Sequence, residues 1–377
     1  MTTHAKLSAS GSHRWIYCPG SVRLEEGIKD SSSFHAQEGT LAHELAEKCL
    51  TDNSPPEQHL GDIRYGITIT EEMCEHVAGY VAYVKSFSGE HFYEERVDFS
   101  KWVPEGFGTS DAIVIDEVNS TCHVIDLKYG KGKEVEAENN TQAICYALGV
   151  HSDHGWLYDI DKYVMHIYQP RISNFSTWEL SLDELMEWGE FIRKQADRCL
   201  SDDAPFNPGE KQCQWCKAKA SCPALYQFTQ ETISADFDKI DEELISPDKV
   251  TNERLKTVLQ SKKLIEGYLQ AVEEHVKDKL KSGEPFPGYK LVAGRSMRKY
   301  RDEEEAQIKL IDLLGDDAFE KTLLSPAKAE KALGSKRKKE LNDIVIKPEG
   351  APTLVPDSDK RKSIFDNEDD FESLDND

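Results

Sequence analysis

The spacing of apolar residues predicts an alternation of helices and strands along the first two thirds of the chain. Leucine, alanine and cysteine recur every three or four residues at 39–50, which predicts a helix, and 71–87 predicts a second one. Three segments rich in β-branched and aromatic residues predict a meander of strands, at 92–99, 108–116 and 121–128. The residues around 118–119 then form a hairpin loop.

Helical periodicity resumes at 141–149, residues 162–170 predict a further strand, and 182–200 predict a strongly amphipathic helix. Helix, three strands, helix and strand in this order are typical of an α+β fold in which a sheet is flanked by helices. With 377 residues, the chain is long enough for two or three domains.

The last third of the chain differs in composition from this core. The elements predicted there are a long charged helix at 247–282, a β-hairpin at 289–302 and a lysine-rich helical stretch to about 341. Residues 357–377 carry nine acidic against three basic side chains, a net charge of −6, which is typical of a disordered tail. We therefore predict a core domain at 1–226, an accessory region at 227–347 and an extended acidic tail at 348–377.

Composition and charge narrow the class of protein. The sequence has no apolar run of about eighteen residues and no signal peptide at its N-terminus, so we expect a cytoplasmic protein without a membrane segment. The formal net charge of −24 argues against a protein that coats nucleic acid through bulk electrostatics, but not against an enzyme that grips DNA locally. Nine cysteines in a reducing compartment predict thiols or metal ligands instead of disulfides.

Four of the cysteines have the pattern of one metal site. Cys213, Cys216 and Cys222 lie in the run QCQWCKAKASCP, and Cys18, 195 residues before Cys213, is the candidate fourth ligand. Thiolates bind either zinc or an iron–sulfur cluster. Three bunched ligands and one isolated ligand favour [4Fe–4S] over the paired knuckles of structural zinc sites, with Zn²⁺ and buried free thiols as the alternatives. The remaining cysteines are expected to be buried: Cys49, Cys74, Cys122, Cys145 and Cys199.

A second group of residues predicts a divalent-cation site in the meander. Asp126 and Lys128 end its third strand and, being two residues apart, point to the same face of it. Hairpin pairing would bring Asp111 of the second strand alongside them. Two carboxylates repel each other unless a cation lies between them, and Mg²⁺ prefers carboxylates, waters and substrate phosphate as ligands. The lysine could then orient or deprotonate an attacking water.

These residues are part of a wider resemblance. The chain resembles the RecB-like branch of the PD-(D/E)xK nuclease superfamily in the order and spacing of its motifs, which are His43 in EGTLAHELAE, Asp111 in GTSD, Asp126 and Lys128 in VIDLKYG, and Gln142 and Tyr146 in TQAICYALG. Its cysteines are arranged as in the iron–sulfur nucleases of that branch, which include those of bacterial recombination helicase-nucleases and of CRISPR adaptation. The resemblance covers residues 8–226, and the remaining third is similar to an uncharacterised family of phages and prophages.

The resemblance implies a PD-(D/E)xK nuclease core, a central mixed sheet flanked by helices and clasped by the cysteine cluster, and a role for each motif residue. The implied metal ligands are His43, Asp111, Asp126 and the backbone carbonyl of Leu127. Lys128 would assist the attacking water, and Gln142 and Tyr146 would position the substrate strand. The residue before Asp111 is a serine instead of the proline of the superfamily name, a position that varies in RecB-like members.

The implied activity is Mg²⁺- or Mn²⁺-dependent exonuclease cleavage of DNA ends or single strands, with 5′ to 3′ polarity, in phage DNA replication or recombination within a bacterial host cell. The alternatives are a non-catalytic, metal-stapled factor for DNA binding or assembly, and a scaffold stapled by zinc. The acidic tail would either dock on a single-strand-binding or recombination protein, or only keep the chain in solution.

Several further side chains are candidates for contacts with the metal or with DNA. Strand alternation places Glu95 instead of Glu94 on the inward face. Glu38 is expected to cap a helix, with approach to the metal as the alternative. The basic loop 129–133, directly after the lysine, is expected to be flexible and to contact DNA. Aromatic side chains that could stack on bases are Trp15, Tyr17, Tyr129 and Trp215, with core packing as the alternative for both tryptophans. Basic side chains that could follow a phosphate backbone are Arg295, Arg298, Lys299, Arg301 and those at 336–339.

Overall fold

The computed structural model describes residues 5–28, 34–234, 252–292, 308–312 and 337. The chain divides into two compact units, Met1–Val292 and Ala293–Asp377. The first unit contains all of the predicted core domain 1–226 and the beginning of the accessory region. The predicted hairpin, the lysine-rich stretch and the acidic tail lie largely or wholly outside the described residues.

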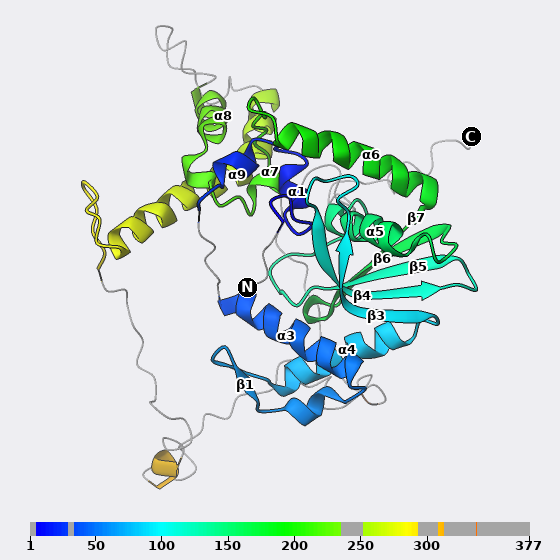
Figure 1. The fold of residues 1–377 in the computed structure, drawn as a ribbon. Coiled ribbons are helices and arrows are strands. Elements are labelled where there is room, and N and C mark those ends of the chain that lie inside the picture. Colours follow the sequence, from blue (N-terminus) through cyan, green and yellow to red (C-terminus); the bar gives the residue numbers. More distant parts are fainter. Residues whose placement is uncertain (1–4, 29–33, 235–251, 293–307, 313–336, 338–377) are drawn as a thin grey trace, which may run out of the picture. The chain divides into compact units, whose positions relative to one another are not determined.

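A five-stranded mixed sheet forms the centre of the first unit (Figure 1). From one edge to the other, its strands are β3 (Glu90–Asp98), β4 (Phe107–Asp116), β5 (Thr121–Leu127), β6 (Lys162–Gln169) and β7 (Asn174–Ser181). Neighbouring strands are antiparallel, except that β5 and β6 are parallel. The predicted meander of three strands is therefore confirmed. Parallel neighbours need a crossover connection, and α5 (Thr141–His154) supplies it.

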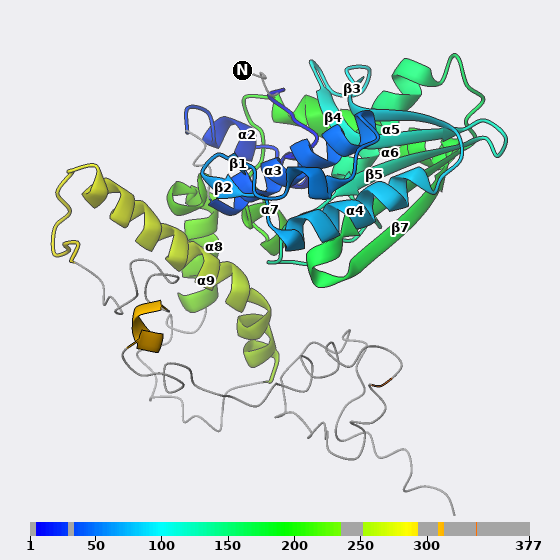
Figure 2. The same cartoon turned by 90° about the horizontal axis from the view of Figure 1, so that it is seen from below.

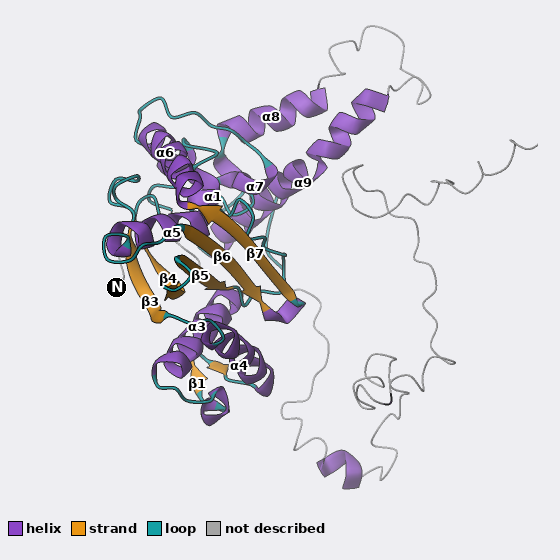
Figure 3. Cartoon of the chain, turned by 90° about the vertical axis from the view of Figure 1, so that its right-hand side faces the viewer, coloured by secondary structure: helices purple, strands orange, loops and turns teal. Residues whose placement is uncertain are grey.

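Helices cover both faces of this sheet. The helices α3 (Phe34–Thr51) and α4 (Glu71–Lys85) lie on one face, and α5 and α6 (Leu182–Cys199) lie on the other (Figures 1 and 3). The predicted α+β class, with a mixed sheet flanked by helices, is confirmed.

Each face of the sheet has its own apolar core, and the strands contribute to both. Ala112 and Val114 of β4 pack with α3 and α4, whereas Ile113 and Ile115 pack with α5 and α6. This division follows from strand geometry, because successive side chains point to opposite faces. The end of β5, which carries Asp126 and leads to Lys128, therefore lies between these two apolar cores.

Side-chain caps fix where two of the core helices begin. Asn140 accepts hydrogen bonds from the backbone N–H groups of Gln142 and Ala143 at the start of α5. Ser181 and Glu184 form a capping box at the start of α6. The cap of α5 matters for the site, since it sets the position from which Gln142 extends.

Shorter elements and two further helices complete the described residues of the first unit. They are α1 (Ser12–Trp15), α2 (Ser21–Leu24), η1 (Pro56–His59), β1 (Ile63–Arg64), β2 (Ile67–Thr68), η2 (Pro170–Ile172), α7 (Glu210–Cys213), η3 (Lys219–Ser221), α8 (Pro223–Ser234) and α9 (Asn252–Lys281). The helix α9 packs against η3, α7 and α8 (Figure 2). None of the described helices is both long and apolar enough to cross a membrane.

The structure adds elements that periodicity does not predict. β7 is an edge strand in which Leu180 is the one buried residue, so its apolar pattern is weak. The small hairpin of β1 and β2 is too short to give an alternation. Helix α3 begins at Phe34, five residues before the predicted start, because Gly39 lies within the helix and does not begin it.

Candidate metal and catalytic site

Asp111 and Asp126 lie where the strands β4 and β5 separate. The pairing of these strands ends at Ala112 and Ile125, one residue short of the two aspartates. Beyond that point the backbone N–H of Leu127 donates to Asp111 Oδ2 at 2.7 Å, in place of a ladder bond. Since the N–H and C=O groups of one residue in a strand point the same way, the Leu127 carbonyl also faces β4. The register of a single hairpin thus brings both carboxylates and this carbonyl together.

Lys128 is held against Asp126 by a chain of polar contacts from α5. Its Nζ lies 2.8 Å from Asp126 Oδ2 and donates to Gln142 Oε1 at 3.0 Å. The amide of Gln142 in turn donates to the hydroxyl of Tyr146 at 3.0 Å. The structure therefore brings the predicted Gln142 and Tyr146 to the lysine, where they fix its orientation.

His43, Glu94 and Asp111 form a group of possible metal ligands, the cation group, which shares Asp111 with the hairpin and does not include the predicted ligand Asp126. One ligand atom from each lies within 4.8 Å of the other two. Nδ1 of His43 is 3.2 Å from Asp111 Oδ1 and 4.0 Å from Glu94 Oε1. Glu94, and not Glu95, therefore belongs to the site.

The backbone at Glu94 explains why strand alternation gives the wrong residue there. Glu94 has φ of 47°, in the left-handed region that side chains rarely adopt. The pairing of β3 with β4 is interrupted at this residue and at Asp111 opposite it, but the register is the same on both sides. This backbone turns the carboxylate of Glu94 toward the cation group. Strained backbone of this kind clusters at functional sites.

Burial and neighbouring charges shift the pKa values of the side chains at the site. Burial disfavours a charge on His43, but the carboxylates of Asp111, Asp126 and Glu94 together outweigh it and raise the pKa of His43 to about 9. Burial and the charge of Asp111 raise the pKa of Glu94 to about 7. Burial raises the pKa of Asp126 against the opposing charge of Lys128. Burial also opposes a charge on Lys128, but Asp126 and Asp111 raise its pKa above its usual range.

A hard divalent cation fits this arrangement. Three acids face two cationic groups, and carboxylate oxygens are the ligands that Mg²⁺ and Mn²⁺ prefer. Asp126 is buried beside the ammonium group of Lys128, whose Nζ donates to Oδ1 at 3.1 Å and lies 2.8 Å from Oδ2. A carboxylate oxygen has more than one lone pair, so a cation bound beside Asp126 would leave the contact with Lys128 in place.

The segment that carries Cys18 and the cysteine loop at 207–222 lie side by side, with α1 against α7. Several hydrogen bonds join them, including those from Gly20 N–H to Pro205 O at 2.9 Å and from Lys217 N–H to the Glu25 carboxylate at 2.7 Å. The ends of the predicted core domain therefore meet through loop contacts.

Two of the four cysteine sulfurs accept backbone hydrogen bonds. Asn207 N–H donates to Cys18 Sγ and Gly209 N–H donates to Cys213 Sγ, both at 3.3 Å. Burial raises the pKa of Cys216 to about 12. Soft donors with N–H groups directed at them fit a thiolate-bound metal group. Among the described residues, however, the four sulfurs do not approach one another as closely as the ligand atoms of His43, Glu94 and Asp111 do.

Comparison with known proteins assigns a family. A model of the family described as "Protein of unknown function (DUF2800)" matches residues 4–362. The chain belongs to this family. A solved structure titled "Crystal structure of SSO0001" is similar to this DUF2800 chain at 18% sequence identity, covering 59% of this chain and 89% of that chain. Its TM-score of 0.29 is too low for any inference about fold or function.

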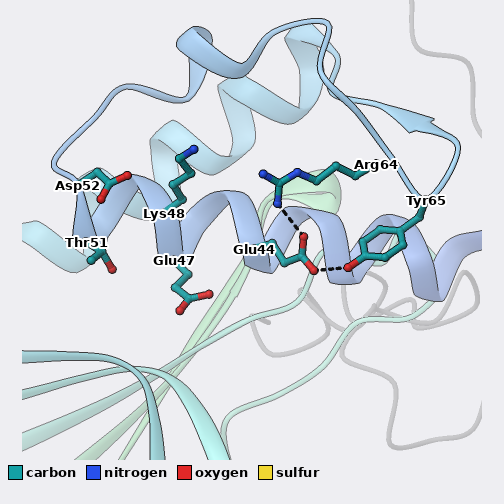
Figure 4. Close-up of a pocket in the computed structure, with 7 residues that line it drawn as sticks. All are labelled: Glu44, Glu47, Lys48, Thr51, Asp52, Arg64 and Tyr65. Carbon is teal, nitrogen blue, oxygen red and sulfur yellow. Dashed lines mark hydrogen bonds and ion pairs between the residues drawn. The ribbon is translucent and has the colours of Figure 1, made fainter. Parts of the chain in front are cut away.

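A pocket of the DUF2800 chain lies beside α3, and neither Asp111, Asp126 nor Lys128 lines it. Residues of α3 and of the β1–β2 hairpin line it, which are Glu44, Glu47, Lys48, Thr51, Asp52, Arg64 and Tyr65 (Figure 4). The Glu44 carboxylate accepts hydrogen bonds from Arg64 and Tyr65 across it. These contacts fasten the hairpin to α3, which carries His43.

The aromatic residues predicted to stack on bases differ in their exposure to solvent. Trp15 and Tyr129 are buried, whereas Tyr17 is 40% and Trp215 64% exposed. Glu38 lies inside α3 and pairs with Arg171 at 2.7 Å, so it neither caps the helix nor joins the cation group. The basic residues predicted at 295–301 and at 336, 338 and 339 lie outside the described residues, as does the acidic tail.

Proposed function

We propose that this member of the DUF2800 family is a Mg²⁺- or Mn²⁺-dependent deoxyribonuclease. The observation that carries the proposal is the convergence of Asp111, Asp126 and Lys128 at the point where β4 and β5 separate. Its substrate would be DNA ends or single strands, with 5′ to 3′ polarity as the first expectation, in phage DNA replication or recombination.

His43, Glu94 and Asp111 would hold the cation, with Asp126 and the Leu127 carbonyl beside them. When bound, such an ion polarises a phosphoryl oxygen and lowers the pKa of a coordinated water. Glu94 enters this ligand set from the geometry alone, since the sequence pattern favours Glu95.

The protein's own groups would orient the reactants and balance charge. Lys128 keeps its proton because Asp126 stabilises the ammonium group, so its charge can offset the charge that develops on the phosphate. Gln142 limits the positions of Nζ, and Tyr146 fixes Gln142. These two residues would then act as positioning residues for the lysine, in addition to any contact with the substrate strand.

The four cysteines would have a structural role. Cys18, Cys213, Cys216 and Cys222 would hold a [4Fe–4S] cluster, with Zn²⁺ as the alternative, and the group would reinforce the loop contacts between the two ends of the core. The chemistry would remain with the carboxylates and the lysine.

Digestion of end-labelled DNA tests this proposal. Single- and double-stranded substrates, labelled at either the 5′ or the 3′ end, are incubated with Mg²⁺ or Mn²⁺. We expect Asp126→Ala and Lys128→Ala to lower the cleavage rate by about a thousandfold or more. Glu95→Gln, a neighbour outside the cation group, serves as the control and should cleave within about twofold of wild type.

Two outcomes would reject the catalytic assignment. Equal cleavage by wild type and both variants would show that the activity lies elsewhere or comes from a contaminant. Binding of DNA by the wild type without any cleavage would instead favour a non-catalytic DNA-binding or assembly factor. Which label disappears first reports the polarity.

A further inference from the structure

The loop that follows Lys128 is held by hydrogen bonds to one buried side chain. Gln169, at the end of β6, is 2% exposed. Its amide nitrogen donates to the carbonyls of Gly130 at 3.0 Å and Lys133 at 2.8 Å. Its amide oxygen accepts from the backbone N–H of Val135 at 3.1 Å. A single amide therefore fixes three positions of a loop that the sequence predicts to be flexible.

Residues just after Gln169 add to this support. The side chain of Asn174 donates to the carbonyl of Val135 at 2.8 Å and to Gln169 Oε1 at 3.1 Å. The guanidinium of Arg171 lies over the ring of Tyr129, 4.7 Å from its centroid. The segment 169–174 thus braces the whole stretch from Tyr129 to Val135.

The two lysines of the loop are held at its sides. Lys131 pairs with Glu72 of α4 at 3.0 Å. Lys133 donates to Gln214 at 2.5 Å, and Gln214 lies between Cys213 and Cys216. Both side chains remain exposed, so their charges are presented to solvent in fixed places beside Lys128.

The glycines of the loop are not required by the fold. A Cβ added at Gly130 or Gly132 would meet no atom of the described residues within 4 Å, and neither residue has a left-handed φ. Glycine at such an exposed position leaves the backbone open to close approach by another molecule. The open side of the loop is the side on which such a molecule would lie.

We infer that residues 130–133 form a preformed binding site for the phosphodiester backbone of a nucleic acid, and that Gln169 is the residue that positions it. The exposed backbone of the loop and its two lysines suit phosphate oxygens, which take hydrogen bonds from backbone N–H groups and from lysine. The inference rests on the proposed nuclease function, because it places the substrate strand next to Lys128. It goes further in assigning both the contact surface and the residue that shapes it.

The role of Gln169 in holding the loop is tested by limited digestion with trypsin, a measurement that does not depend on nuclease activity. In Gln169→Glu the side chain no longer donates to the two carbonyls, and we expect cleavage after Lys131 and Lys133 to become at least about tenfold faster. Gln195→Glu makes the same chemical change on α6, where Gln195 accepts from Arg198, and should leave the rate unchanged. Unchanged cleavage in Gln169→Glu overturns the role of Gln169. If that variant does not fold, Asn174→Ala, which removes the second support, replaces it.

The binding surface is tested with alanine at both glycines. Gly130→Ala/Gly132→Ala should fold as the wild type does, since nothing obstructs the added carbon atoms. We expect its affinity for a fluorescent single-stranded oligonucleotide, measured by anisotropy without divalent ions, to fall at least about fivefold. Gly39→Ala is the matched control, because an added Cβ meets no described atom there either. Wild-type affinity in the double variant overturns the site.

Kinetics separate this inference from the proposed function. Gln169→Glu should raise KM for DNA more than it lowers kcat, because it disturbs binding and leaves Asp126 and Lys128 in place. Cleavage by the wild type with an unchanged KM in Gln169→Glu would reject the positioning role alone. Binding that depends on the loop in a protein that cleaves no DNA would reject the nuclease proposal and support the phosphate site.

Discussion

The carboxylate site and the cysteine site bring their ligands together by different means. Asp111 and Asp126 are gathered by the register of one hairpin, and His43 and Lys128 compensate their charges. The cysteines come from the two ends of the core domain, which are joined by loop contacts such as that from Asn207 to Cys18. Ligand atoms of His43, Glu94 and Asp111 lie within 4.8 Å of one another, whereas the four sulfurs form no such group among the described residues.

This difference predicts different roles for a metal at the two places. Ion pairs and hydrogen bonds within the protein already pair most of the charged groups at the carboxylate site. A cation bound there would therefore replace protons and solvent molecules. At the four cysteines, hydrogen bonds join the two ends of the core, and two of the sulfurs accept backbone N–H groups. A metal would therefore contribute chemistry to the first site and structure to the second.

The largest effect is expected at the cysteine site. Cys213→Ser should remove bound metal and lower the free energy of unfolding by about 5 kcal/mol, since a structural metal contributes directly to folding. Anaerobically purified wild type should contain iron and sulfide and absorb near about 400 nm. Cys199→Ser, at a buried cysteine outside the set, should keep the metal. An unchanged metal content and unfolding midpoint in Cys213→Ser would contradict the structural role.

A smaller but clear effect is expected at the carboxylate site. Lys128→Met leaves the buried carboxylate of Asp126 without its cationic partner, which should lower the free energy of unfolding of the metal-free protein by about 3 kcal/mol. Asp126→Asn in the same chain removes the unpaired charge and should restore most of that loss. Urea unfolding of the single and double variants measures both terms. Additive losses in the double variant would show that the two groups do not stabilise each other.

Glu94 should make the metal-free protein less stable as the pH rises. Its folded pKa of about 7 exceeds its usual value of about 4.5, so the protein loses stability as the pH rises from about 4.5 through 7. Glu94→Gln removes this loss and should be more stable than wild type at pH 8, by about 2 kcal/mol, but equal to it at pH 4. Thermal unfolding over this range measures the difference. Saturating Mn²⁺ should reverse the order, since the variant lacks a ligand. The same pH slope in both proteins would contradict the assignment.

The smallest effect on stability is expected at Trp215. This side chain is 64% exposed in the cysteine loop, so Trp215→Ala should change the free energy of unfolding by less than about 0.5 kcal/mol. Its affinity for single-stranded DNA should nevertheless fall about tenfold if bases stack on the ring. Anisotropy and urea unfolding of the same preparation separate the two. Trp15→Ala provides the contrast, because that ring is buried and its loss should cost about 3 kcal/mol of stability.

Much of the core fold could be predicted from the sequence because its signals are local. The strands β3, β4 and β5 contain β-branched and aromatic residues and are separated by turns, and a hairpin of β4 and β5 then brings Asp111 near Asp126. The amphipathic pattern and the capping box of helix α6 are likewise local. The α+β class followed from the order of such elements.

What could not be predicted depends on contacts between distant parts of the chain. Glu94 enters the cation group through a left-handed backbone, which breaks the alternation on which the choice of Glu95 was based. The side-chain hydrogen bonds to loop 130–135 come from Gln169, 34 to 39 residues later in the sequence. Neither the composition nor the periodicity of a segment reveals which distant residue contacts it. The pairing of Gln142 with Lys128 likewise required the crossover helix to be placed against β5.

The separation of Cys18 from the cysteine loop has a consequence for the newly made protein. A ribosome adds about 5 to 20 residues per second, so the 195 residues between Cys18 and Cys213 take about 10 to 40 seconds to synthesise. The hairpin of β4 and β5 has emerged by then, whereas Cys18 has no partner and its thiol remains open to oxidants. A metal group held by all four cysteines, as proposed, would therefore assemble only after Cys222 has been synthesised.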